Sequence, residues 1–276
     1  MSDERVVVLP DPEACALAAA ELIASTLVEA ASARGDAHWA TTGGSTAGPT
    51  YRHLAQPPLR DVVPWEHVHL WWGDERFVPA DHPLSNVHIA TSDLLEIGAA
   101  SGESGTGASG VDASAGRTAG APIHAGNVHP IPVGPAIGEA EGPDWAARRY
   151  AGELVAAGVE FIDGVPAFDL VLIGMGPDGH VLSIFPGSAA FDAREPVVGV
   201  PAPTHVEPHI ARVTLHPRVL EVARIVILVA HGAAKAEVVG DVLGGERDER
   251  RWPAQLARRA GATWFLDEAA AARIRP

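Results

Sequence analysis

The chain has 276 residues, 47% of them hydrophobic, which is sufficient for one large packed α/β domain. Its formal net charge of -15 argues against nucleic acid or an anionic membrane surface as a partner, because both require a positive protein surface. Cys15 is the single cysteine, so no disulfide can form within the chain, and we expect a cytoplasmic protein in which this thiol only packs. We expect neither a secretory leader nor a membrane span, because no apolar run approaches the roughly 20 residues of a membrane helix.

The first third of the chain alternates helical and strand patterns. Asp11 and Pro12 form a helix start signal, and the apolar helical pattern that follows ends at Gly35. Ser85 is expected to cap a later helix. The patterns predict strands at 38–42 and 67–72, and helices at 49–55 and 86–97.

Residues 98–142 are rich in Gly, Ala, Ser and Pro, and we expect them to form a surface insertion within a single domain covering 1–276. One strand is expected inside this stretch, at 121–133. The remaining patterns predict a helix at 144–157, strands at 168–174, 212–215, 223–230 and 263–266, and helical stretches near Arg218, Lys235 and Glu268. Strands that alternate with helices indicate a mainly parallel twisted sheet with helices on both faces.

The turn after the strand at 168–174 is the most informative segment. Its sequence, GMGPDGH, presents Asp178 and His180 at the carboxyl end of a strand, where open α/β sheets bind small ligands. An imidazole can take a proton from water near neutral pH, and an acidic neighbour can fix its tautomer. The glycines also match G-x-G-x-x-G, but Pro177 and Asp178 stand where a pyrophosphate would lie, which argues against a dinucleotide site. A capping role for Asp178 and a packing role for His180 are the alternatives.

Two more strand ends carry unusual residues. Gly43, Gly44, Ser45 and Thr46 lie between a strand and a helix, where backbone N–H groups and hydroxyls can bind a phosphate, although an ordinary tight turn has the same residues. Asp74, Glu75 and Arg76 follow the next strand. Arg76 can polarise a carbonyl oxygen while the two acids orient it, or the three charges can simply pair with each other.

Isolated cations lie at the ends of two later strand patterns: Lys235 follows the strand at 223–230, and Arg212 opens the strand at 212–215. Lys235, the single lysine, and Arg212 are candidates for binding a phosphate, with solvated surface charges as the alternative. His67 and His69 have no acid or cysteine at ligand spacing, so we predict no metal site. The chain also lacks a G-x-S-x-G nucleophile motif, which leaves activated water as the expected nucleophile.

These blocks resemble the 6-phosphogluconolactonases. The resemblance rests on GGST with TYRHLA, on WWGDERFVPADHPLSNVHIA, on FDLVLIGMGPDGHVLSIFPGS, and on RVTL with GAAKAE, and it covers nearly the whole chain outside residues 98–142. It implies a three-layer α/β fold of the kind shared with glucosamine-6-phosphate deaminases and ribose-5-phosphate isomerases. It also implies hydrolysis of 6-phospho-D-glucono-1,5-lactone in the pentose phosphate pathway, without a metal or other cofactor.

The resemblance further implies residue roles. His180 would activate water beside Asp178, and Arg76 would face the lactone or its oxyanion. The residues implied to hold the phosphate are Gly43, Gly44, Thr46, Arg212 and Lys235. The expected partner is therefore a small sugar phosphate, and we expect a monomer or a small homo-oligomer. Two other functions remain open: an amino-sugar phosphate deaminase or isomerase on the same fold, and a sugar-phosphate sensor without catalytic activity.

Overall fold

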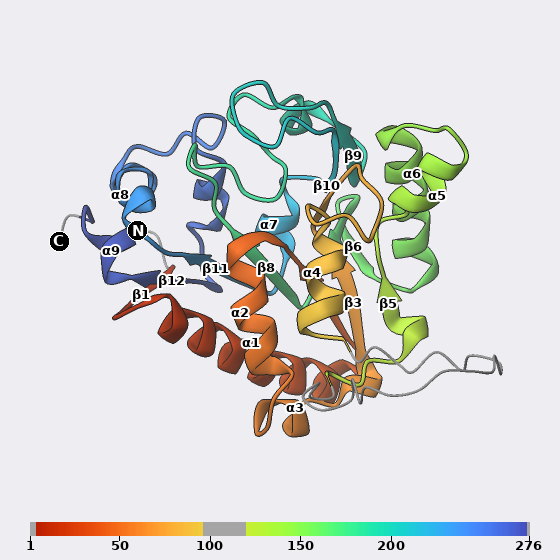
Figure 1. Ribbon diagram of the computed structural model, residues 1–276, viewed down its shortest axis with the longest axis horizontal. Helices are drawn as coiled ribbons and strands as arrows, with labels where there is room; N and C mark the ends of the chain where they lie inside the picture. The colour runs from red at the N-terminus through yellow and green to blue at the C-terminus, as the bar shows by residue number, and fades with distance from the viewer. Residues whose placement is uncertain (1–3, 96–119, 275–276) are drawn as a thin grey trace, which may run out of the picture.

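The computed structural model describes residues 4–95 and 120–274, and it is built around one parallel sheet (Figure 1). The strand order is β1-β12-β11-β8-β2-β3-β5, and neighbouring strands pair in parallel. The strands are β1 (Arg5–Leu9), β2 (Ala37–Thr41), β3 (Val68–Trp72), β5 (Val128–His129), β8 (Leu170–Gly174), β11 (Ile225–Ala230) and β12 (Ala262–Asp267). The predicted fold class is confirmed.

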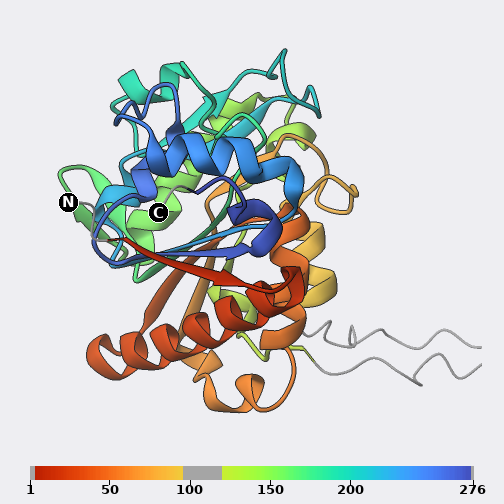
Figure 2. The same ribbon diagram turned by 90° about the vertical axis from the view of Figure 1, so that its left-hand side faces the viewer.

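Helices cover both faces of this sheet. Figure 2 shows α1 below the sheet and α8 above it, so the domain has three layers. The helices are α1 (Pro12–Arg34), α2 (Gly44–Leu54), α3 (Leu59–Val62), α4 (Asn86–Asp93), α5 (Val133–Gly138), α6 (Pro143–Ala156), α7 (Val219–Val222), α8 (Ala236–Gly244) and α9 (Glu268–Ala271). Short 3-10 turns lie at Trp65–His67, Ala125–Asn127, Ala189–Asp192, Ala233–Lys235 and Pro253–Ala257.

Helix α1 begins where the sequence predicts. The Asp11 carboxylate accepts a hydrogen bond from the backbone N–H of Ala14 at 2.8 Å, and Pro12 occupies the first turn. At 23 residues, α1 is long and apolar enough to cross a membrane by length and composition alone, contrary to the expectation that no run approaches this length. Helices in the core of a protein can be equally long and apolar. Helix α1 packs against the sheet through buried residues that include Ile23 and Leu27.

A second, antiparallel sheet lies beside the main one. Its order is β4-β10-β9, formed by Asp74–Arg76, Arg212–Leu215 and Val197–Val200, and it packs against α6 near the top of Figure 1. The predicted strand at 212–215 therefore exists but belongs to this antiparallel sheet. Glu160–Ile162 (β6) and Val165–Ala167 (β7) form a further hairpin.

The later part of the glycine-rich and alanine-rich stretch belongs to the domain itself. Residues 120–142 contain β5, which pairs with β3, and they bury Ala121, Ile131 and Ala136. The prediction of a surface insertion over 98–142 is therefore wrong for this part, because small apolar residues here fill the core. The remainder of the predicted insertion, 98–119, lies outside the described residues.

Candidate functional site

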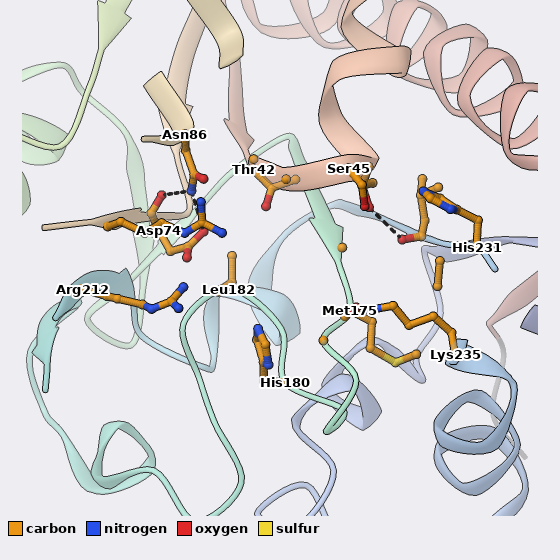
Figure 3. Close-up of a pocket in the computed structure, with 18 residues that line it drawn as sticks. Thr42, Ser45, Asp74, Asn86, Met175, His180, Leu182, Arg212, His231 and Lys235 are labelled. Atoms are coloured by element: carbon orange, nitrogen blue, oxygen red, sulfur yellow. Dashed lines mark hydrogen bonds between the residues drawn. The ribbon is translucent and has the colours of Figure 1, made fainter. Parts of the chain in front are cut away.

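Several strand ends meet at one pocket, which has a volume of about 140 Å³ (Figure 3). The loops that follow β2, β3, β8 and β11 open onto it, because the carboxyl ends of parallel strands share one edge of a sheet. The lining residues are Thr42, Gly43, Gly44, Ser45, Thr46, Asp74, Arg76, Asn86, Gly174, Met175, Gly176, His180, Leu182, Arg212, Val229, Ala230, His231 and Lys235. The structure thus brings together the three predicted turns.

Asp178 orients His180 at the centre of the site. The Asp178 Oδ1 atom lies 2.5 Å from His180 Nδ1, and it also accepts the backbone N–H of His180 at 3.2 Å. Burial alone would raise the pKa of Asp178, but the hydrogen bond and charge of His180, with a bond from His205, hold it well below its usual value. A carboxylate accepts only, so Nδ1 carries the proton and the lone pair is on Nε2. Asp178 itself does not line the pocket.

Gly176 makes this arrangement possible. A Cβ atom at this position would lie 2.0 Å from His180 Nδ1 and 2.7 Å from Asp178 Oδ1, so any side chain would displace the pair. The turn is closed by the N–H of Gly176, which donates to the carbonyl of His180 at 2.8 Å. Gly176 therefore leaves the space that the His180 imidazole and the Asp178 carboxylate occupy.

Two arginines that line the pocket come from paired strands. Arg212 on β10 lies on the left of the pocket in Figure 3. Its register partner in the antiparallel pair is Arg76 on β4. Arg76 Nη1 donates to the carbonyl of Leu84 at 2.6 Å, and Arg212 Nη2 donates to that of Pro208 at 3.2 Å. The Nε atoms of both guanidiniums are buried without a hydrogen-bond partner among the described residues.

Burial lowers the pKa of the Arg212 guanidinium, the charge of Arg76 lowers it further, and Asp74 opposes this effect. Two adjacent like charges with unused donors favour an anion between them.

The sequence analysis expected the two acids to orient the guanidinium of Arg76 or to pair with it, but they bind other groups. Glu75 accepts the backbone N–H groups of Arg76 at 2.6 Å, Asn86 at 2.8 Å and Val87 at 3.0 Å. Burial raises the pKa of Glu75, although these hydrogen bonds oppose the rise. Glu75 thus anchors the start of α4, and it does not line the pocket.

Asp74 is also held within the protein. It accepts a hydrogen bond from Ser183 Oγ at 2.6 Å and from Asn86 Nδ2 at 3.2 Å, and it is 4% exposed. No ion pair joins Arg76 to either acid within the described part of the chain. The predicted charge pairing among the three residues is therefore not what stabilises this strand end.

Lys235 and the start of α2 lie on the other side of His180 (Figure 3). Lys235 Nζ donates to the carbonyl of Met175, and burial lowers the pKa of this lysine. The N-cap of α2 is Gly43, which provides no side-chain hydrogen bond, and no acid occupies the first turn, so backbone N–H groups point at the pocket. Thr46 Oγ1 is turned instead toward the carbonyl of Val229, at 3.4 Å.

The structure therefore divides the residues that were predicted to hold phosphate. Ser45 at the start of α2 and Lys235 lie on one side of His180, whereas Arg212, the register partner of Arg76, lies on the other side (Figure 3). The pocket is cationic although the whole chain carries a net charge of -15.

Sequence reasoning missed several residues at the site. Asn86 lines the pocket with a buried Oδ1 atom that has no hydrogen-bond partner among residues 4–95 and 120–274, and a Cβ at Gly43 would lie 1.9 Å from that atom. Asn86 stands within the block that carries the family resemblance, which was the available signal. His231 lines the pocket and His205 binds Asp178 at 3.0 Å, but neither belongs to a motif with a chemical meaning in sequence.

Comparisons with known proteins agree with this geometry. Residues 10–265 match the family model described as glucosamine-6-phosphate isomerases/6-phosphogluconolactonase. The chain belongs to this family. It is 35% identical to a 6-phosphogluconolactonase of Streptomyces coelicolor, over 99% of this chain and 96% of the relative. It is 31% identical to one of Synechocystis sp., over 92% and 91% of the two chains.

A solved structure of this family has the same fold. The 6-phosphogluconolactonase from Trypanosoma brucei superposes with a TM-score of 0.79 at 28% identity, covering 100% of both chains. The family description names both an isomerase and a lactonase class. The choice between them depends on the chemistry of the pocket.

Proposed function

We propose that the chain hydrolyses 6-phospho-D-glucono-1,5-lactone to 6-phospho-D-gluconate in the oxidative pentose phosphate pathway. The full-length similarity to 6-phosphogluconolactonases supports this assignment. One observation carries it further: a single pocket holds an imidazole oriented by a carboxylate, with cationic groups on both sides. A phosphorylated cyclic ester has an anion at one end and a reactive carbonyl at the other, which suits this arrangement.

In the proposed reaction, His180 Nε2 takes a proton from water while the water oxygen bonds to the lactone carbonyl carbon. The oxyanion that forms lies toward Arg76, with Arg212 beside it. The bond between that carbon and the ring oxygen then breaks, and the imidazolium returns its proton to the ring oxygen. A positioned base contributes about 10²–10⁴ in rate and one oxyanion donor about 10²–10³.

The phosphate is proposed to bind at the opposite side, where Lys235 and the backbone N–H groups of Gly44 and Ser45 face the pocket. This placement fixes the carbonyl near His180, so that binding energy from the remote phosphate positions the reacting group. Arg212 is assigned to the carbonyl side, because its neighbour is Arg76 rather than Lys235.

The proposed partner is thus a small sugar phosphate, and the proposed reaction requires neither a metal nor another cofactor. We also propose a cytoplasmic location. The single cysteine fits this location, because no disulfide can form within the chain. Cys15 is fully buried in α1, and burial raises the pKa of its thiol to about 11.

The test is the His180→Ala variant, assayed by lactone disappearance above the uncatalysed rate. We expect kcat to fall by at least about 100-fold while KM stays within a few-fold, because a base acts on the chemical step. His88→Gln, an exposed histidine on α4, is the matched control and should retain full activity. Near-normal hydrolysis by His180→Ala would refute the assigned base.

The other two functions make different predictions in the same assay. A deaminase would release ammonia from glucosamine 6-phosphate, whereas we expect no release. A sensor without activity would bind the lactone and leave its rate of hydrolysis at the background value. Either result with the wild-type protein would overturn the proposed function.

A further inference from the structure

The Asp178 carboxylate contacts two histidines rather than one. Its Oδ1 atom lies 2.5 Å from His180 Nδ1, and its Oδ2 atom lies 3.0 Å from His205 Nε2. His205 comes from the loop that joins β9, which ends at Val200, to β10, which begins at Arg212. A single carboxylate therefore connects the proposed base to a loop that reaches it from the small sheet.

Packing around Phe185 holds this arrangement together. The Phe185 ring centroid lies 4.7 Å from that of His180 and 5.7 Å from that of His205, the latter in an edge-on contact. The Arg212 guanidinium lies 5.3 Å from the centroid of the same ring. The His205 side chain is still 49% exposed, so its second nitrogen can exchange protons with water.

We propose that His205 is a positioning residue, which fixes the Asp178 carboxylate and couples its own protonation to the basicity of His180. The inference rests on the proposed role of His180 as the base. A carboxylate accepts from both rings, so each imidazole donates one N–H to it. When His205 gains a proton, its positive charge offsets the negative charge of Asp178. The carboxylate then stabilises the His180 imidazolium less.

Other charged groups also lie near Asp178. The cations that act on Asp178 from other elements are Arg212 and Lys235, and burial lowers the pKa of both. On the loop of His205, His209 is engaged elsewhere: its Nε2 atom lies 3.1 Å from Glu207, and its Nδ1 atom lies 2.6 Å from the carbonyl of Pro203. His205 is thus the ionisable side chain that contacts Oδ2 of the carboxylate.

Three variants of the full chain test the proposal: His205→Ala, His205→Gln, and His209→Gln as the matched control on the same loop. In His205→Ala we expect kcat to fall about 5- to 20-fold with KM within about twofold, because the base loses its alignment while the substrate contacts remain. His205→Gln should recover most of kcat, because its amide can donate to Oδ2. His209→Gln should match the wild type.

The pH profile separates coupling from simple packing. In both His205 variants the acid limb of kcat should move upward by about 0.5–1 pH unit, because His180 no longer faces a competing positive charge across Asp178. Histidine NMR titration of the substrate-free protein should show the same displacement for His180. An unmoved acid limb, or failure of His205→Gln to recover kcat, would overturn the proposal.

The two proposals fail in different ways. If His180→Ala remains active, the assigned base is wrong, and this inference falls with it. If His180→Ala is inactive while both His205 variants keep the wild-type rate and pH profile, the base stands and only the role of His205 is refuted.

Discussion

Replacing His129 by Gln is expected to make the fold less sensitive to acid, because three histidine rings lie in contact across β2, β3 and β5. His69 Nδ1 lies 3.1 Å from His129 Nε2, and the ring centroids of His38 and His69 are 4.8 Å apart. The ring of Trp71 stacks on His129 with a centroid distance of 3.9 Å, and its indole N–H donates to His38 at 3.2 Å. This packing disfavours protonation of His129, because the ring is partly buried beside two other histidines.

The effect on stability follows from the pKa of His129. Burial, together with the charges of His69 and His38, lowers this pKa to about 4 from an ordinary value of 6.5. The unfolded state therefore binds more protons below about pH 6.5, and stability falls as the pH drops through that value until about pH 4. This difference between the folded and unfolded pKa of His129 lowers the free energy of unfolding by about 2 kcal/mol at pH 5. Because the ring is partly exposed to solvent, the expected loss is about 1–2 kcal/mol.

Urea unfolding followed by tryptophan fluorescence, repeated between about pH 7.5 and 5, measures this loss directly. The wild type should lose about 1–2 kcal/mol more of its unfolding free energy over this range than His129→Gln does. The exposed His88→Gln variant should follow the wild type. Equal pH dependence in His129→Gln and the wild type would refute the reasoning, whatever the stabilities of the two proteins at pH 7.5.

Two further predictions concern the pocket. Lys235→Met should raise KM for the phosphorylated lactone about 10- to 100-fold with little change in kcat, as for a lost charged hydrogen bond of about 1.5–3 kcal/mol; an unchanged KM would remove Lys235 from the phosphate site. Gly176→Ala should lower kcat at least about 100-fold, because its Cβ would lie 2.0 Å from His180 Nδ1. Gly134→Ala, where nothing lies within 4 Å, is its control, and equal kinetics of the two variants would contradict the crowding argument.

The sequence predicted the elements whose signals are local. The strand at 170–174 is a continuous apolar run, and the caps Asp11 and Ser85 accept the expected backbone N–H groups. The three loops meet because parallel strands place their carboxyl ends at one edge, so the gathering of His180 and Arg76 also followed from topology.

The features that the sequence did not predict depend on contacts between distant segments. The β4 and β10 strands pair across more than 130 residues, and neither short segment indicates its partner, so the position of Arg212 beside Arg76 was not foreseen. Residues 120–142 resemble a surface loop by composition, but Ala and Ile side chains there are buried by neighbours far along the chain. The contact of His205 with Asp178 is likewise made by a loop without a regular pattern.

The charge distribution connects the fold to the proposed substrate. Arg76 and Arg212 face each other on paired strands, so their repulsion must be offset within the same site. Asp74 offsets part of it, but its oxygens already accept bonds from Ser183 and Asn86. Both guanidiniums retain a buried Nε atom that has no partner in the part of the chain that the structure describes. A negative charge that develops on a bound carbonyl oxygen would supply the missing acceptor, which is a reason for this pair to bind the transition state more tightly than the neutral ester.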